Sequence, residues 1–374
     1  MSIVPRHHIA HLTSVHPRHD TRIFGKLCSS LADAGFAVSL VVADGKGDET
    51  SANGVRIMDV GCTTGRLGRM VRATRRVKAR ALALNADLYH LHDPELMPVG
   101  LALKRHGKRV VFDFHEDVPK QLLSKPYLHP WALRLISAAF AKYEEWVVPR
   151  FDAIIGATPT ITDKYRGKAK RLTNINNFPQ LGELESPLPW ESKAKEVAYV
   201  GGISAIRGIV PLVQSLERTR SDARLNLVGE FGDKASEKTV KGFAGWRNVN
   251  DLGFQDRTGV RDVLARSVAG IVTFLPLPNH VDAQPNKMFE YMSAGIPVIA
   301  SDFPLWREII VGQDCGLCVD PLDPGAIAVA VDTLVSNPER AEQMGRNGRI
   351  AVQSVFNWSI EERKLLQLYS DILA

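Results

Sequence analysis

The 374-residue sequence lacks the segments that mark membrane-spanning or disulfide-stabilised proteins. No apolar run approaches the roughly 18 residues that a membrane-spanning helix needs. The opening residues, MSIVPRHHIAHL, show no signal-peptide pattern. Only four cysteines occur, and the single C-x-x-C pair has no second pair or nearby histidine to complete a zinc site. We therefore expect a cytoplasmic protein without structural zinc.

Several catalytic signatures are also missing. The sequence contains no D-x-D, no H-E-x-x-H and no spacing that suits a Ser-His-Asp triad. It also lacks the P-loop and the G-x-G-x-x-G dinucleotide fingerprint. These absences disfavour ATPases and dinucleotide oxidoreductases, and they lead us to expect neither a metal nor a cofactor.

What is present is a basic, globular chain. The sequence is 45% hydrophobic and 24% charged, which excludes a disordered protein. Its formal net charge of +6 indicates anionic partners such as nucleotides or phospholipid surfaces. At this length, two domains are more probable on physical grounds than one large core.

Short apolar runs alternate with helical patterns along the chain. This alternation predicts β-α-β units and two doubly wound parallel sheets. We expect an N-terminal domain at 1–180, a linker at 181–196, a C-terminal domain at 197–357 and a final helix at 358–374. The predicted strands are residues 8–14, 36–44, 55–61, 86–93, 108–116, 151–158, 170–177, 195–204, 223–231, 249–254, 268–276, 296–302 and 316–321.

The stretch HVDAQPNKMFEYMSAGIPVIASDFP, at 280–304, predicts a loop, a helix and a buried strand. Pro285 and Asn286 open the helix, and Lys287 follows them. A cation is unfavourable at a helix N-terminus, which already carries partial positive charge. Lys287 makes sense if an anion such as a phosphate binds there. Asp282 and Glu290 flank the same point.

A second phosphate-binding candidate is YVGGISAIRG, at 199–208. Gly201 and Gly202 follow a predicted strand and allow the backbone to approach a ligand. Arg207 opens the next helix and can bind phosphate through two N–H groups. Together with Lys287, it would neutralise a departing diphosphate.

Acidic residues and histidines mark the carboxyl ends of two predicted strands in the first half. His92 and Asp93 follow one strand, and His115 and Glu116 follow the next. Because ligands of open α/β sheets bind at these strand ends, we expect an active-site rim there. The loop at 13–24 adds a basic rim for an anionic substrate, and Asp20 or Thr21 is expected to cap the following helix. Its candidate substrate contacts are Arg18, Asp20 and Arg22.

The segment at 66–84 predicts a basic amphipathic helix. Its apolar stripe suits packing on a sheet, and its arginines would face outward, where they can meet an anionic membrane. The membrane candidates are Arg66, Arg69, Arg72 and Arg76. Aromatic residues are not interleaved with them, so we do not expect nucleic-acid binding.

Taken together, these motifs resemble the GT-B glycosyltransferases, specifically the retaining enzymes of family 4 in the branch that builds bacterial surface polysaccharides. The most specific parts are YVGGISAIRG, PNKMFEYMSAGIPVIAS, HDPEL and VVFDFHED. The resemblance implies two Rossmann-like domains that face an interdomain cleft. The donor nucleotide would bind to the second domain and the acceptor to the first, and the C-terminal helix would cross back to the first.

The resemblance also implies roles for individual residues. Glu290 matches the second acid of the E-x7-E motif, which holds the donor ribose, and Asp282 matches the first, which contacts the transferred sugar. Arg207 stands where the family has a diphosphate-binding lysine, and Gly202 replaces the family's arginine. His115 matches a histidine near the transferred sugar. We further expect Gly253 and Phe254 to contact the base.

The implied activity is metal-independent, retaining transfer from a UDP- or GDP-linked sugar to a glycan or polyprenyl-diphosphate-linked acceptor in cell-envelope synthesis. The enzyme would then be peripheral on the inner face of the cytoplasmic membrane. Three alternatives stay open from the sequence. They are a nucleotide-sugar 2-epimerase of the same fold, a non-catalytic binding protein, and a transferase for a small soluble acceptor.

Overall fold

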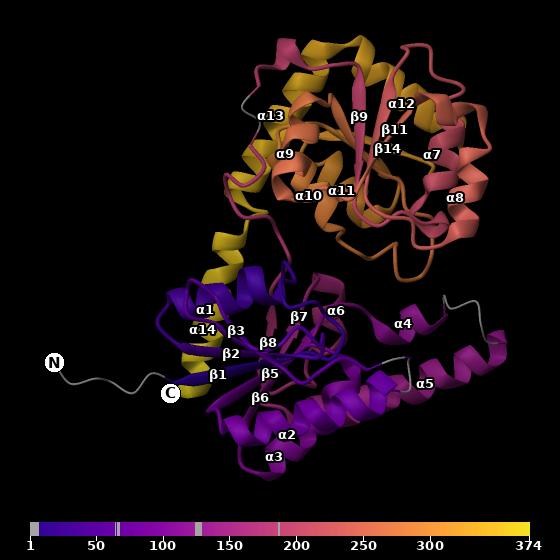
Figure 1. Cartoon of the computed structure of the whole chain (residues 1–374). Coiled ribbons are helices and arrows are strands. Elements are labelled where there is room, and N and C mark those ends of the chain that lie inside the picture. Colours follow the sequence, from indigo (N-terminus) through magenta and orange to yellow (C-terminus); the bar gives the residue numbers. More distant parts are fainter. Residues whose placement is uncertain (1–6, 64, 66–67, 124–128, 186–187) are drawn as a thin grey trace. The chain divides into compact units, whose positions relative to one another are not determined.

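The computed structural model describes residues 7–63, 65, 68–123, 129–185 and 188–374. The chain forms two compact units (Figure 1). Unit 1 contains residues 1–177 and 360–374, and unit 2 contains residues 178–359. Each unit is a largely parallel sheet covered by helices, which confirms the predicted fold class.

Unit 1 is built on an eight-stranded sheet of order β3-β4-β2-β1-β5-β6-β7-β8. All neighbours are parallel except β3, which runs antiparallel to β4. The strands are β1 His8–Leu12, β2 Ala37–Val42, β3 Glu49–Thr50, β4 Arg56–Asp59, β5 Leu88–Leu91, β6 Arg109–Phe114, β7 Ala153–Gly156 and β8 Leu172–Asn174.

Helices cover both faces of this sheet. One hydrophobic cluster joins residues of α2, α3 and α5 to the strands, and Figure 1 shows these helices along one face. The helices are α1 Ser29–Asp33, α2 Thr74–Leu84, α3 Met97–Arg105, α4 Val118–Leu123, α5 Pro130–Val147 and α6 Pro159–Lys164. The shorter turns are η1 Ile23–Cys28, η2 Gly68–Ala73, η3 Pro94–Leu96 and η4 Val148–Arg150.

Unit 2 is built on a six-stranded, fully parallel sheet of order β11-β10-β9-β12-β13-β14. Its strands are β9 Glu196–Val200, β10 Arg224–Val228, β11 Val249–Gly253, β12 Ala269–Val272, β13 Val298–Ser301 and β14 Gly316–Val319. Its helices and turns are α7 Ile209–Ser215, α8 Lys234–Lys241, α9 Arg257–Arg266, α10 Asn286–Ser293, α11 Pro304–Ile310, α12 Pro324–Ser336, α13 Pro338–Ser354, η5 Trp190–Ser192, η6 Ala205–Arg207 and η7 Ala244–Asn248.

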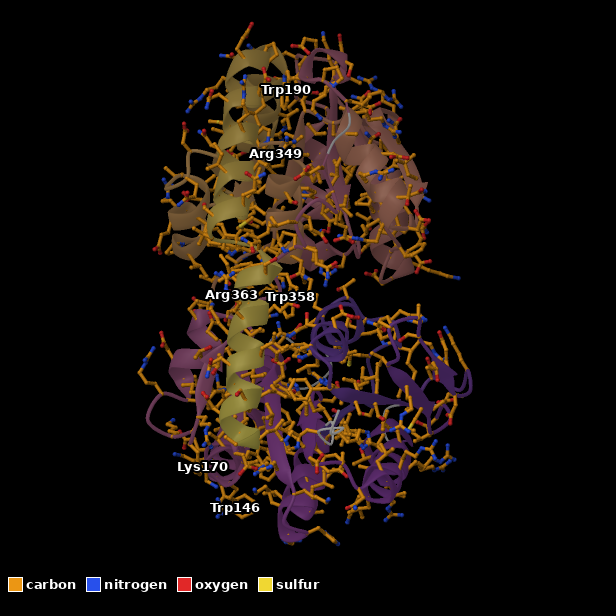
Figure 2. The ribbon with its side chains drawn as sticks, turned by 90° about the vertical axis from the view of Figure 1, so that its left-hand side faces the viewer. Trp146, Lys170, Trp190, Arg349, Trp358 and Arg363 are labelled. Atoms are coloured by element: carbon orange, nitrogen blue, oxygen red, sulfur yellow. The ribbon has the colours of Figure 1, made fainter. Side chains whose placement is uncertain are left out.

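The last helix, α14 Trp358–Leu373, begins in unit 2 and lies mainly in unit 1. Figure 2 labels Trp358 and Arg363 along it. Within unit 1, the Glu361 carboxylate accepts a 2.8 Å hydrogen bond from the Asn176 amide. The Tyr369 hydroxyl lies 2.6 Å from Nδ1 of His90 on β5. The C-terminal residues are therefore part of the core of unit 1.

Every strand predicted from the sequence is present. The pattern missed β3, because it has only two residues, both exposed. The predicted basic helix consists of η2 followed by α2, and residues 66 and 67 lie outside the described part of the chain. Within the described residues, no helix combines the length and the apolar character needed to cross a membrane.

Each sheet has a point where the strand order reverses. In unit 1 it lies between β1 and β5, and in unit 2 between β9 and β12. Adjacent loops leave such a point in opposite directions, which opens a crevice at the carboxyl ends of the strands. In unit 2 the Tyr291 hydroxyl bridges this opening, because it accepts from Val200 N–H at 3.0 Å and donates to the Ile271 carbonyl at 3.3 Å.

Candidate active site

Asp93 joins the ends of β1 and β5 at the reversal point of unit 1. Its buried Oδ2 accepts hydrogen bonds from the Thr13 hydroxyl at 2.8 Å and the Ser14 amide at 2.6 Å. Its Oδ1 lies 3.3 Å from Nε2 of His16. Asp93 therefore fixes the loop that follows β1 and holds His16 at the mouth of the crevice.

Asp113, on β6, is the buried anion of this site. Arg22 donates to both of its oxygens, at 2.9 and 2.8 Å, and Nε2 of His115 lies 3.0 Å from Oδ2. Burial opposes the charge, but Arg22 and His115 hold the pKa of Asp113 well below its usual range. The carboxylate is therefore ionised and orients the His115 ring.

His92 connects His115 to the interior. Its Nδ1 lies 3.2 Å from Nε2 of His115, and its Nε2 lies 3.0 Å from Nδ1 of His11. The His90 ring stacks on His92 with 4.4 Å between centroids. Burial lowers the pKa of His92 to about 4 and those of His11 and His90 well below 6.5. These rings are neutral at pH 7, so each can donate one hydrogen bond and accept another.

Two sets of side chains here bring potential metal-ligand atoms within 4.8 Å of one another. They are His11, His90 and His92, and His92, Asp113 and His115. Arg22 already occupies both oxygens of Asp113 and places a cation beside the cluster. The His90 and His92 rings also stack on each other instead of converging on one point. The arrangement suits a hydrogen-bonded network better than a metal centre.

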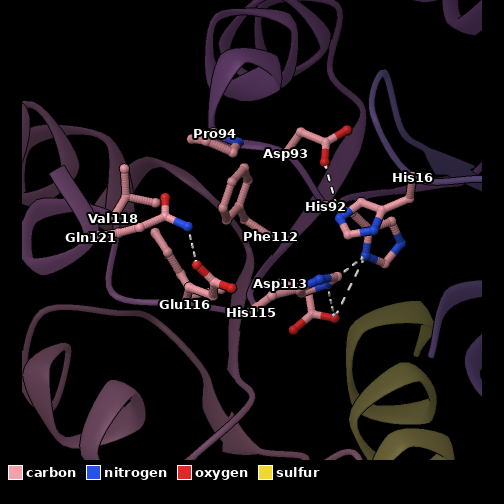
Figure 3. Close-up of a pocket in the computed structure, with 11 residues that line it drawn as sticks. His16, His92, Asp93, Pro94, Phe112, Asp113, His115, Glu116, Val118 and Gln121 are labelled. Carbon is pink, nitrogen blue, oxygen red and sulfur yellow. Dashed lines mark hydrogen bonds and ion pairs between the residues drawn. The ribbon is translucent and has the colours of Figure 1, made fainter. Parts of the chain in front are cut away.

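A cavity of about 220 Å³ opens beside this network. Figure 3 shows His92, Asp113 and His115 on one side and Glu116 with Gln121 on another. The lining combines apolar side chains with a few polar groups, which is the composition of small-molecule sites. The lining residues are His16, His92, Asp93, Pro94, Phe112, Asp113, Phe114, His115, Glu116, Val118 and Gln121.

Two of the predicted acceptor contacts, Arg18 and Arg22, are not among the residues that line this cavity. Arg18 makes four hydrogen bonds within unit 1, to Asp44, Glu49 and the Gly47 carbonyl. Arg22 is committed to Asp113. These pairings hold both arginines within unit 1, and their contact with an acceptor stays a prediction.

Asp20 caps the turn that follows the loop, as predicted. Its Oδ1 accepts from the amides of Arg22 and Ile23, both at 2.9 Å, and its Oδ2 lies 3.5 Å from Nδ1 of His16. Burial acts to raise the pKa of Asp20, but His16 and the Ile23 amide hold this pKa well below its usual range. Burial likewise opposes the charged form of His16, but Asp20 and Asp93 raise its pKa above 6.5.

Lys287 occupies the corresponding crevice in unit 2. Its side chain is only 8% exposed, and Nζ lies 3.7 Å from the centroid of the Tyr199 ring. Among the described residues, Nζ has no hydrogen-bond partner. Burial and the nearby Arg207 lower the pKa of Lys287 well below 10.5. A buried amine without a partner is unfavourable unless an anionic ligand completes its environment.

Gly201 and Gly202 create the space around this lysine. A Cβ on Gly201 would contact Nζ and Cε of Lys287 at 3.6 Å. A Cβ on Gly202 would lie 2.5 Å from NH1 of Arg207, which donates to the Gly202 carbonyl at 3.1 Å. Arg207 therefore lies where a larger residue at 202 would place its side chain.

Glu290, one turn after Lys287 on α10, is held by an arginine that the sequence did not indicate. NH1 of Arg257 donates to Oε1 of Glu290 at 2.7 Å. Nε and NH2 of the same guanidinium donate to Glu183 at 2.7 Å each. The pair of carboxylates fixes Arg257, and Arg257 in turn fixes one oxygen of Glu290, which leaves Oε2 to meet a ligand.

The other predicted donor contacts surround this point in unit 2. Pro285 precedes α10 and Asn286 begins it, so both lie at the helix N-terminus beside Lys287. Asp282 is half-buried in the preceding turn. Gly253 ends β11 with φ of +62°, and Phe254 follows it with 74% of its surface exposed.

The membrane candidates are only partly described. Arg72 and Arg76 are exposed, and Arg76 donates to the Val60 carbonyl at 3.3 Å. Arg66 and the side chain of Arg69 lie outside the described part of the chain.

Sequence reasoning missed Asp113, His11, His90, Arg257 and Glu183. One signal existed for Asp113, because a lone acid inside the apolar strand VVFDF demands a buried partner. The partners of Arg257 lie 74 and 33 residues away, and no local pattern links them.

Two family profiles match this chain. The profile described as "Glycosyl transferase 4-like domain" matches residues 21–174, and "Glycosyl transferases group 1" matches residues 183–351. The two matches fall on the two sheets described above.

Curated relatives are similar over much of the chain. A D-rhamnosyltransferase, WbpZ, of Pseudomonas aeruginosa is 25% identical over 74% of this chain and 71% of its own. A phosphatidyl-myo-inositol mannosyltransferase of Mycobacterium leprae is 23% identical over 76% and 74%. A glycogen synthase of Mycobacterium tuberculosis is 23% identical over 64% of this chain, which spans 59% of that enzyme's length.

Solved structures share the fold across nearly the whole chain. A sucrose-phosphate synthase from Thermosynechococcus elongatus has a TM-score of 0.80 at 20% identity, covering 98% of this chain and 99% of its own. The Anabaena protein HepE, solved with UDP-glucose, has a TM-score of 0.72 at 16% identity, covering 97% and 99%. The chain therefore belongs to the GT-B glycosyltransferases of the family 4 type.

Proposed function

We propose that this enzyme is a retaining glycosyltransferase that uses a UDP- or GDP-linked sugar and a glycan or lipid-linked acceptor. The observation that carries the donor assignment is the buried amine of Lys287, which has no hydrogen-bond partner among the described residues. It lies beside Gly201, near Arg207 and at the N-terminus of α10. Two cations and a helix N-terminus together suit a diphosphate.

In this proposal the diphosphate leaves as an anion that Arg207, Lys287 and the first turn of α10 stabilise. Charge stabilisation of the leaving group lowers the barrier most when it strengthens in the transition state. The free oxygen of Glu290 accepts from the ribose, because Arg257 holds the other oxygen. Gly253 and the exposed ring of Phe254 contact the base, and Asp282 contacts the transferred sugar.

The acceptor would bind in the cavity of unit 1. At about 220 Å³ the cavity is smaller than a typical drug-sized site, so it suits a single sugar ring at the end of a longer acceptor. His115, oriented by Asp113, would exchange hydrogen bonds with sugar hydroxyls, and His92 would orient it, because the two ring nitrogens of His92 already face His115 and His11. Glu116 and Asp93 complete the polar rim.

Retention and metal independence follow from the same proposal. The two cations supply the positive charge that a divalent metal supplies in other transferases. The oxocarbenium-like sugar would then react on the face that the diphosphate leaves, and no residue is required to form a covalent intermediate.

The relatives' names support parts of this proposal. WbpZ is named as a D-rhamnosyltransferase, and the mycobacterial relative as a phosphatidyl-myo-inositol mannosyltransferase. HepE was solved with UDP-glucose. A role in cell-envelope polysaccharide synthesis at the inner face of the cytoplasmic membrane fits these relatives and the basic helix with Arg72 and Arg76.

The first test is thermal unfolding with UDP, GDP, dTDP, ADP and CMP. A ligand at about 100 times its Kd adds roughly 2.7 kcal/mol of stability. We expect one diphosphate to raise the melting temperature selectively, and Glu290→Ala to abolish that shift. Glu308→Ala, an exposed acid on α11, is the matched control. No shift with any nucleotide would contradict the donor assignment.

The reaction itself is tested with donor sugars linked to the nucleoside diphosphate that binds. Proton NMR of the product should show the anomeric configuration of the donor, and excess EDTA should leave the rate unchanged. An inverted product would exclude the retaining mechanism. Loss of activity in EDTA, restored by a divalent cation, would exclude metal independence.

A further inference from the structure

Helix α5 in unit 1 exposes a stripe of large apolar side chains. Trp131 is 65% exposed, Leu135 is 64% exposed and Trp146 is 49% exposed. At 3.6 residues per turn they lie within an arc of about 60°, together with Lys142. Figure 2 labels Trp146 at the outer edge of unit 1. We call Trp131, Leu135 and Trp146 the α5 stripe.

The fold does not require this stripe, because the other side of α5 already fills the core. Leu133, Ser137, Glu144 and Val147 are buried. Glu144 accepts from Lys164 at 2.7 Å and from the Tyr165 hydroxyl at 3.0 Å, which fixes the helix on α6. Exposed apolar groups that gather on one helix face mark an interaction surface more often than scattered ones do.

The charges around the stripe favour an anionic partner. Arg134 and Arg150 are exposed at its sides, and Lys142 is exposed within its arc. The Arg150 guanidinium lies 3.8 Å from the Trp146 ring centroid. The acid Glu145 is paired with Lys142 and with Lys168, each at 3.0 Å, so the pairing neutralises it. Helix α2, which carries exposed Arg76 and follows exposed Arg72 of η2, packs into the same hydrophobic cluster.

Tryptophan beside arginine and lysine is the composition of a helix that lies in a membrane interface. The amphipathic indole suits the headgroup level, and basic side chains bind anionic lipids. A protein partner would fit the apolar residues, but it would not explain why basic residues flank them. A single-stranded nucleic acid would need successive stacking platforms, and α5 offers two well-separated indoles.

The buried face of α5, opposite the stripe, packs against helix α4 of the candidate acceptor cavity. Helix α4 contributes Val118 and Gln121 to the cavity wall. The Ser137 hydroxyl of α5 donates to the Pro119 carbonyl of α4 at 2.8 Å, which ties the two helices together. Leu123, at the end of α4, is 41% exposed. At 3.6 residues per turn, Ser137 lies roughly opposite the α5 stripe, so a surface that meets the stripe lies on the other side of α5 from the cavity wall.

We propose that the α5 stripe, with Arg134, Lys142 and Arg150, docks unit 1 onto an anionic lipid surface. Docking would keep unit 1 at the membrane that carries a lipid-linked acceptor. The second statement rests on the proposed function, whereas lipid binding stands on the stripe alone.

The test is co-flotation of the full chain with vesicles of phosphatidylcholine that contain about one third phosphatidylglycerol, compared with pure phosphatidylcholine. We expect binding to the anionic vesicles and a loss of about tenfold or more in Trp131→Ser/Leu135→Ser. Arg134→Glu/Arg150→Glu should weaken binding to anionic vesicles. Val329→Ser/Ile350→Ser removes two equally exposed apolar side chains from unit 2 and should change nothing.

Each outcome decides the proposal. If the parent does not bind anionic vesicles, or if Trp131→Ser/Leu135→Ser binds as the parent does, the proposal is wrong. If the parent is a dimer that the same substitutions dissociate, and the monomer still floats with vesicles, the stripe is a protein interface instead. Nucleotide-induced thermal shifts in the same preparations report on unit 2, so a failure of lipid docking is distinguishable from a failure of the donor assignment.

Discussion

The buried amine of Lys287 lowers the free energy of unfolding of the protein without ligand. Its folded-state pKa is depressed, so the folded protein binds fewer protons than the unfolded chain between that pKa and 10.5. Stability therefore rises with pH across this window, and at pH 7 the lysine opposes folding. Such a residue makes physical sense only if a ligand repays the loss.

We predict that Lys287→Met makes the free protein more stable and reduces the stability that it gains from bound nucleotide. Methionine has a similar volume and no charge to bury. The melting temperature without ligand should rise, while the shift with the preferred nucleoside diphosphate should fall by most of its value. Differential scanning fluorimetry measures both quantities.

Lys193 provides the control for this substitution. It is also partly buried, but its Nζ donates to the carbonyls of Leu264 and Ala265, at 3.3 and 2.6 Å. Lys193→Met should lower the melting temperature, because it leaves those carbonyls unpaired. If Lys287→Met were equally destabilising, the amine of Lys287 would have a structural partner and the donor assignment would lose its main support.

Residues whose role follows from a local conflict could be predicted from the sequence, and those whose role depends on a distant partner could not. Lys287 at a helix start conflicts with the helix dipole, and this conflict is visible in eight residues. Arg18 and Arg22 looked alike in a basic loop. Only the folded structure shows that Arg22 pairs with Asp113 and that Arg18 pairs with Asp44.

At the scale of elements, α9 and α10 are joined by Arg257. We predict that Arg257→Ala weakens binding of the nucleoside diphosphate by about fivefold, equivalent to about 1 kcal/mol for a charge-assisted hydrogen bond at a partly exposed site. The cause would be loss of the fixed orientation of Glu290. Isothermal titration calorimetry measures the change.

Arg261→Ala is the matched control, because Arg261 lies one turn further along α9 and, within the described residues, its guanidinium pairs with its neighbour Asp262. Arg257→Lys should recover little affinity, since an ammonium cannot bridge Glu183 and Glu290 with the same planar geometry. If Arg257→Ala leaves the Kd unchanged while Glu290→Ala abolishes binding, Glu290 needs no support from Arg257.

The histidines on β1 and β5 make unit 1 sensitive to acid. His92 has a folded-state pKa of about 4 against 6.5 unfolded, so its contribution is present above pH 6.5 and is lost as the pH falls toward 4. At 1.36 kcal/mol per pH unit this amounts to about 3 kcal/mol. The stability that His16 contributes depends on pH in the opposite direction. Because its folded-state pKa is raised, this contribution is lost as the pH rises.

We therefore predict that hydrogen exchange of the β1 and β5 amides accelerates between pH 6.5 and 4.5, after correction for intrinsic exchange, more than exchange of β9 and β12 does. His92→Gln should flatten this dependence while it lowers the stability at neutral pH. Equal pH slopes in the parent and the variant would assign the acid sensitivity to other groups.

The strands were predictable because parallel strands buried on both faces appear as continuous apolar runs. The short turns η1 and η2 were not predictable, because a π-helical turn differs from an α-helical one only in which carbonyl each amide reaches. The candidate site lies at the carboxyl ends of strands, where the sequence predicted it. Both sheets reverse their strand order at β1/β5 and β9/β12, and the general rule for such sheets places ligands at those points.

At the scale of the molecule, unit 1 is assembled from both ends of the chain. Residues 360–374 supply Tyr369, which meets His90, and Glu361, which accepts from the Asn176 amide. Leu365, Leu368 and Tyr369 are buried, so the segment contributes core as well as hydrogen bonds. The expectation that the C-terminal helix crosses back to the first domain comes from the family resemblance, because no local pattern in 358–374 indicates which sheet this helix covers.

We predict that removing residues 360–374 unfolds unit 1 and leaves unit 2 able to bind nucleotide. Truncation exposes the apolar surface that α14 covers and leaves His90 without its hydroxyl partner, a loss larger than the margin by which domains of this size are stable. Limited proteolysis should then degrade residues before 178 and spare a fragment that still shows a nucleotide-dependent thermal shift. Glu361→Gln keeps the helix and should cost only part of this stability. A truncated chain whose unit 1 resists proteolysis as the parent does would mean that α14 only rests on a core already complete, and the C-terminal residues would then have to be assigned to unit 2.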